Sequence, residues 1–312
     1  MYNSIVMKNN KFFVYLRVLR VNQWIKNLVI FTAIIFSGQL FNIDLFVNTI
    51  RAFFIFCLLS SSSYILNDII DYPFDKKHSI KKYRPIASGE ISMPEATFLA
   101  FVLTIVSLLL ALFFSTSFFI ISLVFIILHF LYSLFLKKHP VIDIFTISFS
   151  FTIRAYAGVV ATGFHIPVWM MLTIFFMSLF MATVKRHAEL VAHGKETRIS
   201  LYKYNEHFLD FLTYTATTST IMSYSFYTYF EKLPQTETEF SNFFNLTFPG
   251  FEARKWLMVS IPLVVYGIAR YAQLLYEKAE GERPEKIITT DIPLVVTIGL
   301  WGIIVISLIY LL

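Results

Sequence analysis

A series of long apolar runs, separated by short polar connections, most constrains what this chain can fold into. About nine such runs can be drawn, each close to the roughly 20 residues that an apolar helix needs to cross a bilayer. They cover residues 24–41, 46–66, 97–114, 118–136, 141–161, 168–184, 211–230, 256–275 and 293–312. Of the 312 residues, 57% are hydrophobic and only 15% are charged, whereas soluble domains carry roughly 25% charged residues. The sequence therefore predicts an all-α integral membrane protein, with residues 1–312 forming a single bundle of about nine transmembrane helices.

The basic residues indicate how the chain is oriented. Most of the 26 Lys and Arg residues precede the first run or fall in the connections after the second, fourth, sixth and eighth runs. Cytoplasmic connections of membrane proteins carry an excess of Lys and Arg. We therefore expect a multi-pass protein of the cell (inner) membrane, with its N-terminus and these connections in the cytoplasm. The net charge of +6 fits this asymmetry and attraction to anionic lipid headgroups, so it needs no nucleic-acid partner.

A cluster of three carboxylates directly follows the second apolar run. Asp68, Asp71 and Asp75 have the spacing i, i+3 and i+7, which places them on one side of a helix. Carboxylates at the mouth of a span are costly unless they are paired or bound, and Mg²⁺ is a suitable hard cation. Pro73 disfavours helix at Tyr72, so the one-face expectation holds for Asp68 and Asp71, whereas Asp75 needs a kink. The alternative interpretation is an ordinary solvated loop between two spans.

Basic residues follow these carboxylates and complete the pattern of an anion site. Lys81, Lys82 and Arg84 can neutralise diphosphate oxygens that a metal leaves free. A metal-bound diphosphate becomes a good leaving group because the charge that develops on departure is neutralised. Asn67 either contacts the substrate or caps the end of the helix. The stretch thus predicts a seat for a metal-bound diphosphate.

This stretch resembles the first signature of the UbiA-type intramembrane prenyltransferases. The resemblance rests on Asn-Asp-Ile-Ile-Asp-Tyr-Pro-Phe-Asp at 67–75, followed by Arg-Pro-Ile-Ala-Ser-Gly at 84–89. It implies a helical bundle around a central cavity open to the cytoplasmic side, with Mg²⁺ and a diphosphate bound at this motif. It also implies that Asp68, Asp71 and Asp75 are the catalytic metal ligands, and that residues 67–96 and 185–208 form the catalytic connections.

The region after the sixth run departs from the commonest pattern of that family. Members that join a prenyl diphosphate to an aromatic acceptor carry a second Asp-x-x-x-Asp motif there. This chain has Lys-Arg-His-Ala-Glu at 185–189, and in this it resembles the decaprenyl-phosphate phosphoribosyltransferase branch. Residues 20–27 and 154–158 are also similar to that branch. The resemblance implies transfer of a 5-phosphoribosyl group from 5-phosphoribosyl 1-diphosphate to a polyprenyl (decaprenyl-like) phosphate, in the synthesis of precursors for cell-envelope polysaccharides.

The chemistry of such an acceptor agrees with the basic connection. A lipid phosphate is an anion, so a second set of carboxylates would repel it, whereas Lys185 and Arg186 can hold it. The acceptor is already ionised at neutral pH and needs no general base. The reaction therefore reduces to positioning, neutralisation of the leaving diphosphate, and in-line attack with inversion at the anomeric carbon.

Further candidate substrate contacts have a structural alternative beside the functional one. Lys26 can simply snorkel to the membrane interface, and Arg186 can pair with Glu189 at i+3. Arg154 lies within a span, where a charge faces a cavity or a partner. Asp143 is about three helical turns away from it, so another span must supply that partner. The complete set of candidates is Gln23, Lys26, Asn67, Lys82, Arg84, Tyr132, Lys137, Arg154, Lys185, Arg186 and Glu189.

Two other functions compete with phosphoribosyl transfer. A UbiA-type aromatic prenyltransferase would act on a polyprenyl diphosphate, but the second acidic motif of such enzymes is missing here. A membrane transporter would more often show internal repeats and place its acids at the midplane, whereas these acids gather at one mouth. Polyprenyl phosphate, 5-phosphoribosyl diphosphate and the lipid bilayer are the expected partners, and the sequence leaves an oligomer open.

Overall fold

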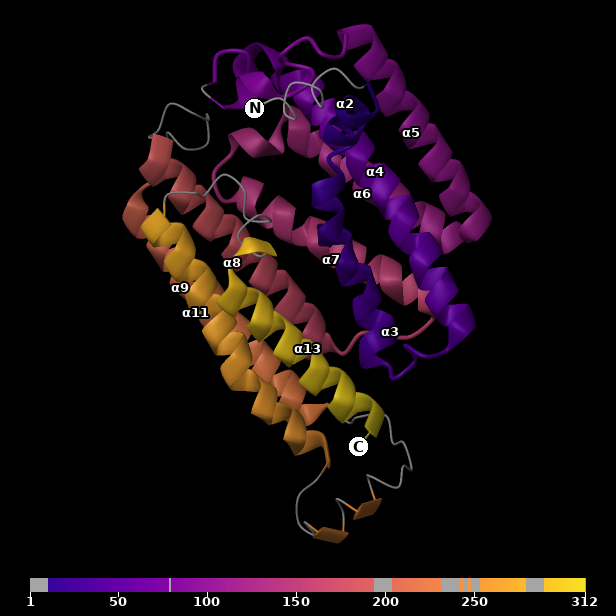
Figure 1. Cartoon of the computed structure of the whole chain (residues 1–312), viewed down its shortest axis with the longest axis vertical. Helices are drawn as coiled ribbons and strands as arrows, with labels where there is room; N and C mark the ends of the chain where they lie inside the picture. The colour runs from indigo at the N-terminus through magenta and orange to yellow at the C-terminus, as the bar shows by residue number, and fades with distance from the viewer. Residues whose placement is uncertain are drawn as a thin grey trace.

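The computed structural model describes residues 11–78, 80–193, 204–231, 242–243, 246–247, 253–278 and 289–311. Part of the expected 185–208 connection, residues 194–203, therefore lies outside the described residues. All the secondary structure in the described part of the chain is helical (Figure 1). In chain order the elements are α2 (Lys11–Val18), η1 (Val21–Phe31), α3 (Thr32–Phe36), α4 (Ile43–Asp75), η2 (Lys81–Tyr83), α5 (Met93–Phe114), α6 (Thr116–Leu134), η3 (Leu136–Lys138), α7 (Ile142–Thr162), α8 (Val168–His193), α9 (Glu206–Phe230), η6 (Ala253–Ser260), α11 (Ile261–Lys278) and α13 (Ile292–Leu311).

The all-α membrane architecture is confirmed, whereas the number of spans differs from the expected nine. In the described residues, 7 helices are long and apolar enough to cross a membrane, or up to 8 if the bent pair Lys11–Val18 and Val21–Phe36 forms one span. The difference is α9, which covers the predicted run at 211–230. This helix is long enough, but its many Thr, Ser and Tyr residues lower its hydropathy. It packs along α8 through buried Leu209 and Ala216.

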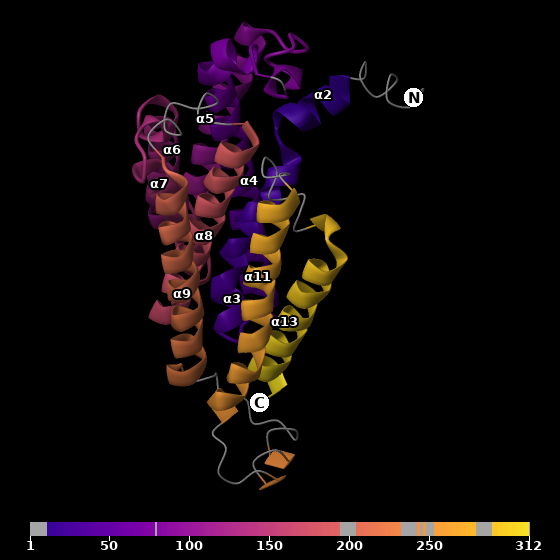
Figure 2. The same ribbon diagram turned by 90° about the vertical axis from the view of Figure 1, so that its left-hand side faces the viewer.

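Successive helices run in opposite directions, and the polar side chains of the acidic cluster lie at one end of the bundle. The ends of α4, α6 and α8 meet the beginnings of α5, α7 and α9 at the end that also carries α2 (Figures 1 and 2). The C-terminal helix α13 ends at the opposite side of the molecule (Figure 2). Consecutive connections thus alternate between the two ends, as the expected orientation requires.

Helix α4 carries the acidic cluster on its last two turns. Asn42 caps the beginning of the helix by accepting a hydrogen bond from the backbone N–H of Leu45 at 3.3 Å. The helix continues through Pro73 and ends at Asp75, instead of ending within the motif. Pro73 removes one i→i−4 hydrogen bond from the end of the helix, but it does not interrupt α4. Asp68 and Asp75, seven residues apart, therefore lie almost above one another.

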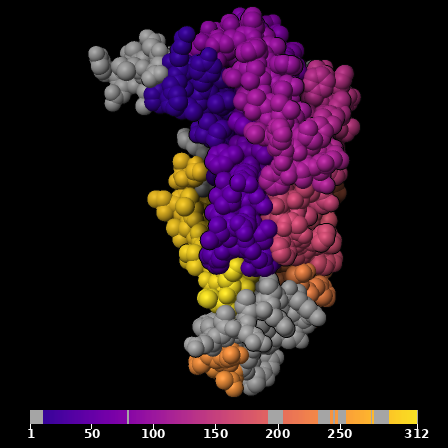
Figure 3. Space-filling view, turned by 90° about the vertical axis from the view of Figure 1, so that its right-hand side faces the viewer, coloured from indigo at the N-terminus to yellow at the C-terminus, as the bar shows by residue number. Residues whose placement is uncertain are grey.

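Helix α7 lies at the centre of the bundle and is the most buried of the candidate spans. The N-terminal elements η1 and α3 pack against it, and Figure 3 shows the N-terminal elements, in indigo, between α13, in yellow, and the magenta and pink helices. The chain bends by 45° between α2 and η1, where Arg20 adopts a positive φ of 51°. Gly158 of α7 permits the close approach of η1, because a Cβ at this position would overlap the backbone carbonyl of Ile30.

Gly158→Ala is expected to destabilise the protein by about 1–3 kcal/mol, since the added methyl group must displace backbone atoms. The apparent midpoint of thermal unfolding in detergent measures this effect. Gly299→Ala in α13 is the matched control, because nothing lies within 4 Å of a Cβ there and alanine favours helix. An unchanged midpoint for Gly158→Ala would contradict the close packing of η1 on α7.

Candidate active site

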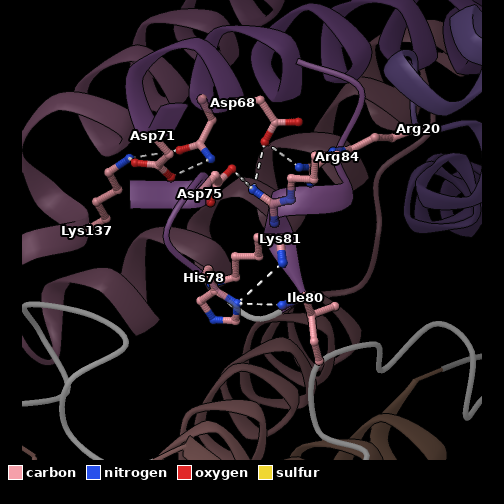
Figure 4. Close-up of polar contacts among 10 residues, drawn as sticks. Arg20, Asp68, Asp71, Asp75, His78, Ile80, Lys81, Arg84 and Lys137 are labelled. Carbon is pink, nitrogen blue, oxygen red and sulfur yellow. Dashed lines mark hydrogen bonds and ion pairs between the residues drawn. The ribbon is translucent and has the colours of Figure 1, made fainter. Parts of the chain in front are cut away.

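Arg84 joins two of the three carboxylates at the end of α4 (Figure 4). Its Nη1 atom donates to Asp68 Oδ1 at 2.9 Å and to Asp75 Oδ2 at 2.7 Å. The arginine reaches them from the connection that follows η2. Arg20 approaches from the bend before η1, and its Nη2 atom lies 2.5 Å from the same Asp68 oxygen. Asp68 is only 6% exposed, so two guanidinium groups compensate a nearly buried carboxylate.

Asp71 turns to a different partner. Lys137, from η3, places its Nζ atom 2.6 Å from Asp71 Oδ1 and 3.1 Å from Asn67 Oδ1. The Asn67 amide in turn donates to Asp71 Oδ2 at 3.1 Å. The expected kink at Pro73 is thus corrected, because the uninterrupted helix keeps the three carboxylates on one side without it, with Asp71 paired to Lys137 beyond the end of α6. The structure brings together Asn67, Asp68, Asp71, Asp75, Arg84 and Lys137 from the predicted site residues (Figure 4).

The donor set of this cluster suits a hard divalent cation. Three carboxylates and the Asn67 side-chain oxygen lie within two turns of one helix, and oxygen ligands are those that Mg²⁺ prefers. As the side chains lie here, no three His, Cys, Asp or Glu residues of the described chain form a group that could hold a metal. Asp68, Asp71 and Asp75 are each paired with an arginine or a lysine. The oxygen atoms of these side chains are suitable ligands for Mg²⁺. In this structure, basic side chains balance the charges of the carboxylates.

A second polar cluster lies around Arg186 on α8. Its Nε atom is 3.0 Å from Asp143 Oδ2, its Nη1 atom is 2.7 Å from Glu189 Oε2, and its Nη2 atom donates to the Tyr132 hydroxyl at 3.3 Å. Arg186 is 2% exposed and Asp143 is fully buried. Arg186 therefore connects α6, α7 and α8. It also forms the i+3 ion pair with Glu189, which the sequence suggests as a structural alternative to a substrate contact. Substrate contact by Arg186, Glu189 or Tyr132 stays a prediction.

Tyr204 completes this cluster from the segment before α9. Its hydroxyl donates to Asp143 Oδ1 at 2.7 Å and accepts from the backbone N–H of Val141 at 2.6 Å. Burial, and then the Asp143 carboxylate, raise the pKa of the Tyr204 phenol, so it stays protonated and donates at neutral pH. Val141 has a φ of 69°, which a β-branched residue rarely adopts. The two hydrogen bonds of Tyr204 hold this strained beginning of α7 in place.

Arg154 has one neutral partner from a neighbouring element, Asn27 of η1, and a second, Ser150, on its own helix. Its Nε atom donates to Asn27 Oδ1 at 2.8 Å, and its Nη1 atom donates to the carbonyl and the hydroxyl of Ser150 at 3.1 and 2.6 Å. The guanidinium carbon also lies 4.7 Å from the ring centroid of Phe125 and 5.2 Å from that of Phe151. At 2% exposure, Arg154 is a buried cation held by an amide, a hydroxyl, a carbonyl and aromatic faces.

Four further predicted residues lie on η1, η2 and α8. Lys26 is half-buried on η1, and its ammonium is 6.0 Å from the ring centroid of Tyr64. Lys82 is exposed, with its ammonium 5.2 Å from the Tyr83 ring. Gln23 is half-buried on η1, and Lys185 is half-buried on α8 beside Arg186.

Sequence reasoning missed four residues that organise these clusters. They are Arg20, Asn27, Asp143 and Tyr204. The sequence suggests no site role for Arg20 or Asp143 beyond their places in the resemblance to the phosphoribosyltransferase branch, and it places Asp143 too far along the helix to pair with Arg154. Arg20 and Asn27 both belong to the 20–27 stretch that resembles the phosphoribosyltransferase branch, which is the one signal that could have singled them out. Nothing in the sequence marks Tyr204.

Comparisons with known proteins agree with the acidic motif and the fold. The sequence profile of the UbiA prenyltransferase family matches residues 28–288. The decaprenyl-phosphate phosphoribosyltransferase of Corynebacterium glutamicum is 31% identical over 304 residues, which cover 95% of this chain and 86% of that protein. The enzyme of the same description from Mycolicibacterium smegmatis is 32% identical, covering 88% of this chain and 86% of its own length.

Solved structures share the architecture at low sequence identity. The structure of a UbiA homologue from Archaeoglobus fulgidus bound to DMAPP and Mg²⁺ has a TM-score of 0.67 and is 19% identical, covering 96% of this chain and 99% of that one. The same homologue bound to GPP and Mg²⁺ gives a TM-score of 0.66 at 18% identity. These likenesses show the fold.

Proposed function

The chain belongs to the UbiA prenyltransferase family, and we propose that it transfers a 5-phosphoribosyl group from 5-phosphoribosyl 1-diphosphate to a polyprenyl phosphate. The observation that carries this proposal is the similarity to decaprenyl-phosphate phosphoribosyltransferases over 95% of the chain. The sequence at 185–189, where aromatic prenyltransferases carry a second acidic motif, has Lys185 and Arg186 and so does not place carboxylates that would repel an anionic acceptor. The chain is a transferase, and the substrates are the proposed part.

The donor binds at the acidic end of α4. Asp68, Asp71 and Asp75 would hold Mg²⁺, which supplies neutralising charge for the departing diphosphate. Arg84 and Lys137 neutralise the remaining diphosphate oxygens as they turn from the carboxylates they now pair with. Charge-assisted hydrogen bonds of this kind are short and strong. The ion pairs thus keep the carboxylates that would bind the metal next to the cations that bind the diphosphate.

The transfer step needs no proton to move. An oxygen of the lipid phosphate forms a bond to the anomeric carbon of the ribosyl group while the bond from that carbon to the diphosphate oxygen breaks. The diphosphate leaves with the bonding electron pair, and the product is a phosphodiester between ribose and lipid. The protein contributes by holding two anions on opposite sides of the ribosyl carbon. Inversion at this carbon follows from that arrangement.

The cytoplasmic face of the cell membrane is the proposed location of the site. The described basic residues Arg20, Arg84, Lys137 and Lys185 lie at the end of the bundle that carries the acidic cluster, and an excess of basic residues is typical of cytoplasmic connections. A polyprenyl phosphate stays in the bilayer while the soluble donor arrives from the cytoplasm. The product is suited to the assembly of cell-envelope polysaccharide precursors.

A transfer assay with purified protein tests this function. The protein in detergent is given 5-phosphoribosyl diphosphate labelled in the ribose, a polyprenyl phosphate and Mg²⁺, and the organic phase is counted. We expect labelled lipid, no labelled lipid after chelation with EDTA, and recovery when Mg²⁺ is added in excess. A parallel reaction with a prenyl diphosphate and an aromatic acid is expected to give no product. Prenylated aromatic acid in that reaction, without labelled lipid in the first, would replace the proposal with aromatic prenyl transfer.

A further inference from the structure

A second group of positive charges lies on the bundle side of the acidic cluster, around Tyr64 of α4. The guanidinium carbon of Arg20 is 5.4 Å from the ring centroid of Tyr64, and the ammonium of Lys26 is 6.0 Å from it. Arg154 is also within electrostatic reach of the Tyr64 phenol. Tyr64 precedes Asp68 by one helical turn, about 6 Å of rise. Arg20 and Lys26 therefore gather around Tyr64, next to the carboxylates, and Arg154 lies deeper on the side that leads into the membrane.

Two of these cations lack an acidic partner. Arg20 pairs with Asp68, but no ion pair of Lys26 or Arg154 occurs among the described residues. Arg154 lies deep, because its partner Asn27 also accepts from the hydroxyl of Ser60 at 3.2 Å. Ser60 lies about 12 Å along α4 from Asp68, at 1.5 Å per residue. A charge at such depth is costly and generally marks a functional site, so these cations call for an anion that the described side chains do not supply.

His129 of α6 gives an independent sign of a ligand at this place. Its Nε2 atom is buried and has no hydrogen-bond partner in the described structure. The centroid of its ring lies 4.4 Å from that of the Phe125 ring, and the guanidinium of Arg154 lies over the same Phe125 ring. The imidazole is within electrostatic reach of both Arg154 and Lys26. Buried polar atoms are rarely left unpaired, so this buried Nε2 in the neighbourhood of two cations is suited to a ligand that carries oxygen acceptors.

We propose that Lys26, Arg154, Tyr64 and His129 form a binding site for a phosphate monoester, and that its occupant is the phosphate of the lipid acceptor. The ammonium of Lys26, the Tyr64 hydroxyl and the His129 ring supply donors. The hydrogen bonds of Arg154 to Asn27 and Ser150 use Nε and Nη1, which leaves its Nη2 edge for the ligand.

The position favours the lipid as the source of the phosphate. This inference rests on the proposed function, in which the donor's diphosphate occupies the acidic end of α4. In-line transfer then places the acceptor anion on the other side of the ribosyl carbon, and a lipid phosphate enters from the membrane side. The alternative place for it, Arg186, has its guanidinium taken up by Asp143, Glu189 and Tyr132. The other source of the same chemistry is the 5-phosphate of the donor.

Direct binding measured without the second substrate tests the site. Farnesyl phosphate serves as a short lipid phosphate for the purified protein in detergent, farnesol is its uncharged counterpart, and 5-phosphoribosyl diphosphate with Mg²⁺ is measured separately by calorimetry. Lys26→Gln is expected to weaken farnesyl phosphate binding about tenfold or more, since a charge-assisted hydrogen bond is lost. Lys26→Arg is expected to restore most of the affinity. Binding of farnesol and of the donor is expected to stay within about twofold of wild type.

Two further variants make the result decisive. Lys138→Gln removes an exposed charge at the same end of the molecule and is expected to bind all three compounds as wild type does. Arg154→Lys keeps the charge but not the geometry and is expected to weaken farnesyl phosphate binding. Unchanged farnesyl phosphate affinity in both Lys26→Gln and folded Arg154→Lys would overturn the site. Loss of donor binding instead would assign the cations to the donor's 5-phosphate and overturn the lipid as occupant. Lys26-dependent binding without any transfer activity would refute the proposed reaction and leave the phosphate site standing.

Discussion

Asp68→Asn is expected to lower the turnover number about a thousandfold or more, because the loss of a metal-binding carboxylate removes charge stabilisation of the leaving diphosphate. Asparagine keeps the size of the side chain but cannot neutralise the two arginines that converge on Asp68 at 2.5 and 2.9 Å. Asp71→Asn is expected to have an effect of similar size, since Asp71 is the partner of Lys137. Initial rates of lipid labelling measure both effects.

The same change at the far end of the helix is the control for these variants. Asp44 lies exposed in the first turn of α4, and Asp44→Asn is expected to keep turnover within about twofold of wild type. Size-exclusion profiles and thermal midpoints establish that the variants remain folded. Turnover near the wild-type value in folded Asp68→Asn and Asp71→Asn would place the metal and the diphosphate elsewhere.

Breaking the buried pair between Arg186 and Asp143 is expected to have the largest effect on stability. The two side chains are 2% and 0% exposed and lie 3.0 Å apart. Arg186→Met leaves the buried Asp143 carboxylate without a cation, which costs about 3–5 kcal/mol, and should lower the apparent thermal midpoint strongly. Asp143→Asn leaves Arg186 paired with Glu189 and should lower the midpoint less, and the double variant should lose less than the sum of the two single losses.

A surface ion pair supplies the comparison for this prediction. Arg17 and Glu90 also form an ion pair, with side chains that are 41% and 21% exposed, and such pairs contribute about 0–1 kcal/mol. Arg17→Gln is thus expected to leave the midpoint nearly unchanged. If Arg186→Met unfolded like wild type but bound the lipid phosphate poorly, Arg186 would be a substrate contact and not a tie between helices.

The sequence was sufficient to predict the kind of fold. Apolar runs of membrane-spanning length need helices, because every backbone polar group must find a partner within the lipid. The same argument fails for α9, whose Thr, Ser and Tyr residues make it less apolar than a lone span. The acidic site stays a prediction, whereas the expected kink at Pro73 is wrong because α4 continues to Asp75. Pro73 still removes one i→i−4 hydrogen bond, and the sequence alone does not show whether the helix continues beyond it.

The pairing of charges was the part that the sequence could not give. Asp71 pairs with Lys137 across 66 residues, and Arg154 bonds Asn27 across 127 residues. Such contacts depend on how helices are rotated against each other, and one helix offers several side chains to several neighbours. Spacing arguments reach only residues within one element, which is why the Arg186–Glu189 pair was predicted and the Arg186–Asp143 pair was not.

A donor carrying two labels tests the central claim most directly. 5-Phosphoribosyl 1-diphosphate labelled with ¹⁴C in the ribose and with ³²P in the β-phosphate is incubated with the purified protein, polyprenyl phosphate and Mg²⁺. Phosphoribosyl transfer predicts that ¹⁴C enters the lipid, that ³²P remains in the aqueous phase as diphosphate, and that the two products form in equal amounts. Stereochemical analysis of the lipid product should show an inverted anomeric carbon. Lipid without ¹⁴C, or lipid that contains ³²P, would contradict the account.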